Sequence, residues 1–135
     1  MPHQLQIHRL LLASILVLSA AGAGGCDDDD DDDGAGTGAT CPPGSTLTYA
    51  SFGQQFMTTY CTRCHASTLT GAARMGAPEF HDFDTIEGIR AVADHIDEQA
   101  GAGPDATNVA MPPTGSMPTL DQRKMLAEWI ACQAP

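Results

Sequence analysis

Two cysteines three residues apart, followed directly by a histidine, constrain this 135-residue chain more than any other feature. They form the segment Cys61-Thr62-Arg63-Cys64-His65. This pattern is the attachment signature of c-type haem, in which both thiols form thioethers with the porphyrin. One helical turn places the two sulfurs along one edge of the ring, and the imidazole of His65 then lies beneath the iron as its proximal ligand. The segment therefore predicts a covalently held haem.

A Cys-x-x-Cys pair also occurs in zinc sites and in thiol redox sites. A structural zinc site needs a second close pair of ligands, whereas Cys26, Cys41 and Cys132 are scattered along the chain. A thioredoxin-like site follows a strand in a βαβ pattern, and no alternating or β-branched run precedes Cys61. Haem is therefore favoured over both alternatives, which the sequence leaves open.

Residues 1–25 read as a secretory signal peptide, with a Leu-rich stretch from residue 10 to 18 and a run of small residues after it. Residues 21–23 suit an ordinary signal peptidase, whereas the sequence Ala-Gly-Gly-Cys at residues 23–26 resembles a bacterial lipobox. We favour lipidation of Cys26, with a free or mispaired thiol as the alternative. The expected location is the periplasm, with membrane contact only through this lipid anchor.

Residues 26–40 carry little apolar surface to bury, because seven consecutive aspartates precede a run of Gly, Ala and Thr. Such a segment predicts a disordered tether. Cation binding by the aspartates is less favoured, since a flexible run lacks the defined geometry of a calcium loop. We expect residues 41–135 to form the folded domain.

The cysteines also predict a disulfide. With Cys61 and Cys64 assigned to haem and Cys26 to lipid, only Cys41 and Cys132 remain. An oxidising compartment favours their pairing, and the bridge would close a long loop and hold both ends of the domain.

The net negative charge of the chain limits the kinds of partner that it can attract. The segment after residue 40 holds ten acidic and five basic residues, and the chain as a whole has a net charge of −11. Nucleic acid and anionic membrane surfaces are therefore not expected as partners, whereas a redox protein with a basic docking surface would be steered toward the domain.

A helix is predicted from Leu47 to Cys61, since small and apolar residues recur there at helical spacing. Within it, Gly53, Phe56 and Met57 resemble the N-terminal helix of class I c-type cytochromes. In that family, a glycine eight residues before the first haem cysteine lets this helix cross a C-terminal helix closely. The resemblance covers most of the chain from residue 47 to residue 132.

A C-terminal helix is predicted to begin after Thr119, because Thr119 and Gln122 form a capping box. Its expected buried stripe consists of Met125, Leu126, Trp129 and Ile130. The resemblance places Trp129 at an aromatic position of the family, so we expect it to pack on Gly53 and Phe56.

Residues 66–83 show no sustained period and predict an irregular loop. In the resembled family, a loop proline carbonyl accepts a hydrogen bond from the proximal imidazole, and Pro78 matches it best, with a plain turn proline as the alternative. A packing helix is predicted over residues 84–99, with its stripe formed by Ile86, Ile89, Ala93 and Ile96. His81 and His95 are expected to be surface or hydrogen-bonded histidines rather than iron ligands.

The second axial ligand is expected to be Met111. The segment from Asn108 to Pro113 is similar to the methionine loop of class I cytochromes, and the following proline stiffens the chain that presents the sulfur. Met117 and Met75 are the rivals. Met117 is less favoured because it lies so near the next helix that little chain remains to return across the haem.

The resemblance implies a small all-α cytochrome c fold, with three main helices around one haem. His/Met ligation leaves no open iron position, so the implied function is electron transfer, and a domain this small should be largely unfolded without haem. The alternative is a haem enzyme or sensor of the peroxidase-like or gas-binding kind, with an open or labile sixth position. A third alternative is an interaction module that holds no haem.

Overall fold

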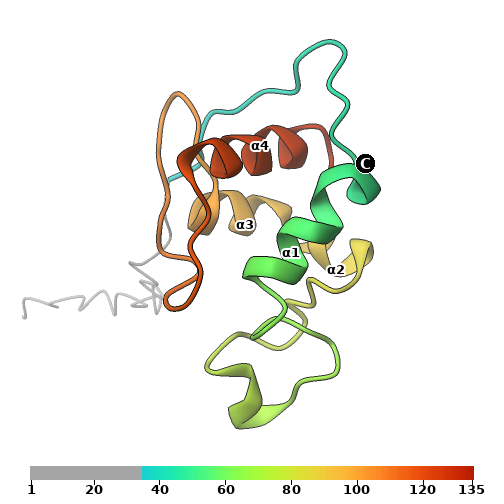
Figure 1. Cartoon of the computed structure of the whole chain (residues 1–135), viewed down its shortest axis with the longest axis vertical. Helices are drawn as coiled ribbons and strands as arrows, with labels where there is room; N and C mark the ends of the chain where they lie inside the picture. Colours follow the sequence, from blue (N-terminus) through green and yellow to red (C-terminus); the bar gives the residue numbers. More distant parts are fainter. Residues whose placement is uncertain (1–34) are drawn as a thin grey trace, which may run out of the picture.

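The computed structural model describes residues 35–135, which form a cluster of helices joined by long loops (Figure 1). In this part of the chain there is no strand, and one isolated antiparallel bridge joins Ala102 to Thr107. The helical elements are the π-helical turn η1 (Tyr49–Gly53), α1 (Gln54–Tyr60), the 3₁₀ turn η2 (Gly71–Arg74), α2 (Ile86–Ala91), α3 (Ala93–Ala100) and α4 (Leu120–Ala131). The described part is therefore all-α, as predicted.

The predicted N-terminal helix is present as two joined elements, η1 and α1. Thr48 caps η1 reciprocally with Ser51: each side chain accepts a hydrogen bond from the other residue's backbone amide, at 3.0 and 2.9 Å. The amide of Cys61 donates to the carbonyl of Met57 at 2.8 Å, so the first cysteine continues the last turn of α1.

α4 begins as the capping box of Thr119 and Gln122 predicts. Leu126, Trp129 and Ile130 are buried, but Met125 is 39% exposed, so its assignment to the buried stripe was wrong. Residues three or four apart share a helix face, and the place of Met125 on the buried face is taken by Arg123, which lies three residues before Leu126.

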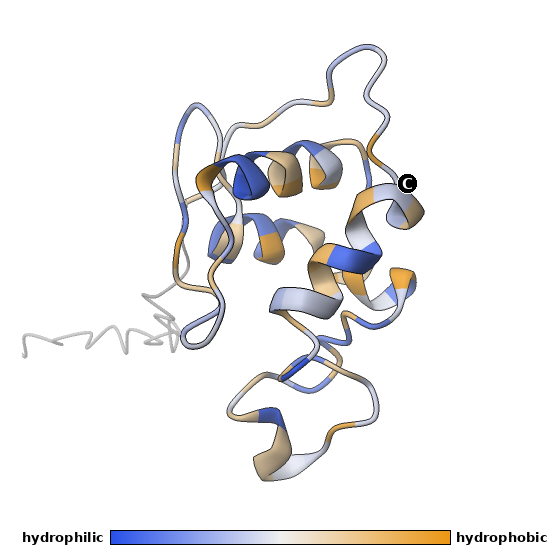
Figure 2. Ribbon diagram, viewed as in Figure 1, coloured by the Kyte–Doolittle hydropathy of each residue, from blue (hydrophilic) through white to orange (hydrophobic). Residues whose placement is uncertain are grey.

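The single helix predicted over residues 84–99 is two helices, α2 and α3. Val92 leaves helical geometry at φ −133° and ψ 34°, and its amide donates to the carbonyl of Ile89 at 3.3 Å. Ile89 and Ile96 are both buried, as predicted. α3 and α4 lie side by side (Figure 1), and hydrophilic and hydrophobic residues alternate along both helices (Figure 2), as amphipathic packing requires.

The two ends of the domain are fastened together. Cys41 and Cys132 form a disulfide across 91 residues, with their Cα atoms 4.7 Å apart, which confirms the predicted pairing. Beyond it, Ala134 is fully buried, and the carbonyl of Pro135 accepts hydrogen bonds from the indole of Trp129 and the amide of Tyr49.

The ordered contacts begin before the predicted domain boundary at residue 41. Thr37 is fully buried, because its amide and hydroxyl donate to the carboxylate of Asp97 on α3 at 2.8 and 2.9 Å. Residues 35–40 thus belong to the folded region and not to the tether. The predicted signal peptide, Cys26 and the seven aspartates lie outside the described residues. Within residues 35–135, no helix is long and apolar enough to cross a membrane.

Candidate functional site

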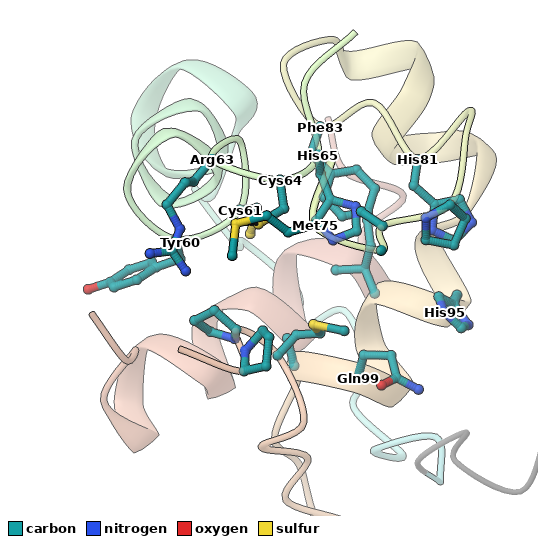
Figure 3. A pocket seen from close by; sticks show the side chains of 18 of the residues that line it. Tyr60, Cys61, Arg63, Cys64, His65, Met75, His81, Phe83, His95 and Gln99 are labelled. Carbon is teal, nitrogen blue, oxygen red and sulfur yellow. Dashed lines mark hydrogen bonds between the residues drawn. The ribbon is translucent and has the colours of Figure 1, made fainter. Parts of the chain in front are cut away.

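A cavity of about 260 Å³ lies among the end of α1, the loop of residues 66–83, α3 and the segment before α4. All five residues predicted to contact a haem line it: Cys61, Cys64, His65, Pro78 and Met111. Figure 3 shows the two cysteines and the histidine together on one wall, with His81 and His95 to one side. Residues from four separate segments of sequence are therefore brought to one site.

Cys61 and Cys64 are both free thiols, although the domain holds a disulfide elsewhere. Burial raises the pKa of the Cys61 thiol to about 12, and the positive charge of Arg123 opposes this only in part. A reactive redox cysteine needs the opposite environment, one that lowers the thiol pKa. Within residues 35–135, no group of three or more His, Cys, Asp or Glu side chains is arranged to hold a metal ion.

His65 is buried, and its imidazole stacks on the ring of Phe83 with the centroids 4.4 Å apart and the planes within 10°. Desolvation lowers the pKa of His65 to about 4, an effect that the backbone of His81 opposes in part. The imidazole is therefore neutral near pH 7. Its Nδ1 atom is buried and has no hydrogen-bond partner.

The carbonyl of Pro78 has a different partner from the one predicted. It accepts a hydrogen bond from Nη2 of Arg74 at 2.6 Å. The predicted bond from the imidazole of His65 to Pro78 is not formed in the described structure. Pro78 thus lines the cavity but does not hold the imidazole.

Met111 is half-buried and is anchored through its main chain. Its amide donates to the carbonyl of Gln99 at 2.9 Å, and its carbonyl accepts from Nη1 of Arg123 at 2.9 Å. Of its two rivals, Met117 is 51% exposed and does not line the cavity, whereas Met75 lines it but is 62% exposed. Met111 is thus the one of the three methionines that both lines the cavity and is half-buried.

His81 and His95 lie at the edge of the cavity, with their ring centroids 5.2 Å apart. Both are half-buried, and burial lowers the pKa of His81, as do the nearby His95 and Arg74. The ring of His81 lies 6.2 Å from that of His65, so the three histidines form a row along this side of the cavity.

Two buried arginines were not predicted. Nη1 of Arg123 donates to the carbonyls of Ala100, Asn108 and Met111 at 2.9 to 3.0 Å, and so ties α3 and the methionine segment to α4. The burial of Arg123 could have been predicted from its position three residues before Leu126, on the same helix face. The burial of Arg74 could not, because it lies in an irregular loop with no periodic pattern.

Comparison of the chain with protein-family models, curated proteins and solved structures gave no match.

Proposed function

We propose that this protein carries one c-type haem, bound through thioethers at Cys61 and Cys64, and that it transfers electrons with His65 and Met111 as axial ligands. The proposal rests above all on the convergence of these four side chains on one cavity, although 50 residues of sequence separate the first from the last.

The donor set suits an iron porphyrin. Two unpaired thiols and a neutral imidazole share one wall of a largely apolar cavity, and a thioether reaches the same cavity from the segment before α4. A bound haem would supply one-electron chemistry between the ferric and ferrous states, and a thioether ligand would favour the ferrous one.

The chain's own contribution is exclusion of water and fixed placement of the ligands. Phe56, Phe83 and Ile96 are buried and line the cavity, so the site has a low dielectric environment. Phe83 fixes the plane of the His65 ring by stacking, and two main-chain hydrogen bonds hold Met111. Ligands fixed in this way need little reorganisation between the two oxidation states.

The partner proposed for this carrier is a redox protein with a basic docking surface, met in the periplasm. Acidic residues outnumber basic ones two to one after residue 40, so long-range attraction would favour a positively charged partner. Lipidation of Cys26 would hold the domain near the membrane where such partners meet it.

Mass spectrometry of the mature protein tests the proposal, after expression with a haem-attachment system. We expect the added mass of one haem and the optical spectrum of a low-spin c-type cytochrome. A Cys61→Ala, Cys64→Ala double variant should lack both and lose most of its helical circular dichroism. A colourless wild-type protein of unmodified mass would contradict the proposal.

A further inference from the structure

Residues 35–37, which we call the N-terminal strap, are fixed to α3 and to the loop after it. The amide and hydroxyl of Thr37 donate to the carboxylate of Asp97 at 2.8 and 2.9 Å, and the carbonyl of Thr37 accepts from the amide of Asp105 at 2.9 Å. Gly103 leaves room for this contact, since a Cβ atom there would overlap the carbonyl of Thr37. The strap is therefore packed into the domain, with Thr37 fully buried.

Asn108 joins the strap to α3. Its side-chain Nδ2 donates to the carbonyl of Ala35 at 2.7 Å and to that of Asp97 at 2.9 Å. Its main chain is fixed as well, because its amide donates to the carbonyl of Gly101 at 2.8 Å and its carbonyl accepts from Nη1 of Arg123 at 3.0 Å. Asn108 is 9% exposed, so these bonds are largely shielded from water. Four hydrogen bonds thus set the position of this residue.

The position of Asn108 affects Met111, three residues later. A single nitrogen, Nη1 of Arg123, donates to the carbonyls of both residues, at 3.0 and 2.9 Å. The amide of Met111 donates to the carbonyl of Gln99 on α3, so the segment of residues 108–111 is held at both ends. A shift of Asn108 would misalign the shared donor and with it the residue whose side chain lines the cavity.

We propose that Asn108 is a positioning residue for Met111, and that the N-terminal strap is the support through which it acts. The inference rests on the proposed function, in which Met111 is the sixth ligand of the iron. Residues that orient a metal ligand commonly change its binding as strongly as the ligand's own contacts do. Residues 35–37, which the sequence assigns to the tether, therefore contribute to the site.

The test measures how readily added imidazole replaces Met111 on the ferric iron of the haem-loaded protein. Imidazole competes with the sulfur for one position, so its apparent dissociation constant falls when the chain holds Met111 less firmly. Asn108→Ala removes both side-chain hydrogen bonds. We expect the constant to fall at least about five-fold, the factor that corresponds to one typical hydrogen bond. The amide of Met111 should also exchange its hydrogen faster.

Variants of Thr37 separate its hydrogen bond from its packing. Thr37→Val keeps the buried volume but lacks the hydroxyl that donates to Asp97, whereas Thr37→Ser keeps the hydroxyl. We expect tighter imidazole binding in Thr37→Val and the wild-type value in Thr37→Ser. Ser45→Ala is the matched control, because the hydroxyl of Ser45 donates to the carboxylate of Glu128 on α4 at 2.7 Å and neither residue lines the cavity. Its imidazole constant should stay unchanged.

Equal imidazole constants in the wild type, Asn108→Ala and Thr37→Val would overturn the inference. So would a change in Thr37→Ser or Ser45→Ala as large as that in Thr37→Val, because the effect would then be one of general stability. A change in Asn108→Ala alone would remove the strap from the proposal. If Asn108→Ala does not fold, the two Thr37 variants decide. Failure of the proposed function is recognised separately, because the purified wild type would then carry no haem.

Discussion

The indole of Trp129 lies directly against the backbone of Gly53, where a Cβ atom would overlap the six-membered part of the ring. This contact brings α4 across the junction of η1 and α1, one helical segment ahead of the Cys-x-x-Cys-His motif. Trp129 is fully buried, so its ring has no room to move aside. The placement of the motif thus depends on the smallest residue at this crossing.

Gly53→Ala should therefore destabilise the protein. Added bulk in a well-packed core costs about 1–3 kcal/mol, which exceeds the helix propensity that alanine gains over glycine. Urea unfolding followed by circular dichroism measures the difference. Gly36→Ala is the control, since nothing lies within 4 Å of a Cβ there. Equal stability of the two variants would contradict the proposed close contact.

Removal of the disulfide should lower stability without emptying the cavity. The bridge closes a loop of 91 residues, and loss of a native disulfide costs about 2–5 kcal/mol. A Cys41→Ala, Cys132→Ala double variant should show this loss in urea unfolding and become insensitive to reductant. Haem attachment at Cys61 and Cys64 should persist, and its loss would show that the bridge is needed to form the site.

The structural features that depend on local sequence, or on residues with few possible roles, could be predicted. The cap at Thr119, the pairing of Cys41 with Cys132, and the fit of Trp129 on Gly53 each follow from residues that have few alternative uses. Met111 likewise stands in a segment with its own signature, and it reaches the cavity.

Features that depend on a partner far away in the sequence could not be predicted. Thr37 is polar and lies in a Gly-rich run, yet it is buried because Asp97, 60 residues later, accepts its hydrogen bonds. Arg74 is buried because five backbone carbonyls of an irregular loop accept hydrogen bonds from its guanidinium. No periodicity in the sequence reports such tertiary hydrogen bonds.

Arg123→Gln should loosen the segment that carries Met111. The guanidinium links three carbonyls, and hydrogen bonds to a charged group contribute about 1.5–3 kcal/mol each when buried. We expect a stability loss of at least that size in urea unfolding. Lys124→Gln, at the neighbouring exposed position, should change stability by no more than about 0.5 kcal/mol. Similar effects from both variants would show that Arg123 does not hold the segment.

In the proposed haem protein, Met111→Ala should open the sixth position of the iron. The ferric protein should lose the weak far-red absorbance band of a sulfur–iron bond, and the ferrous protein should bind carbon monoxide without denaturant. Met117→Ala is the control, because Met117 is exposed and does not line the cavity. Carbon monoxide binding by the wild-type protein would instead support a haem enzyme or sensor with a labile ligand.

The proposed electron transfer with a basic partner should slow as salt is added. Exposed charges are screened beyond about 8–10 Å at physiological ionic strength, so the attraction between an acidic domain and a basic protein weakens. Glu79 is exposed beside Pro78 at the cavity, whereas Glu87 is exposed on α2 and does not line it. Charges at the rim of a contact chiefly change the association rate. In stopped-flow measurements at low salt, the rate of reduction by the partner should therefore fall a few-fold in Glu79→Gln and less in Glu87→Gln. Rates independent of both salt and these substitutions would rule out electrostatic steering.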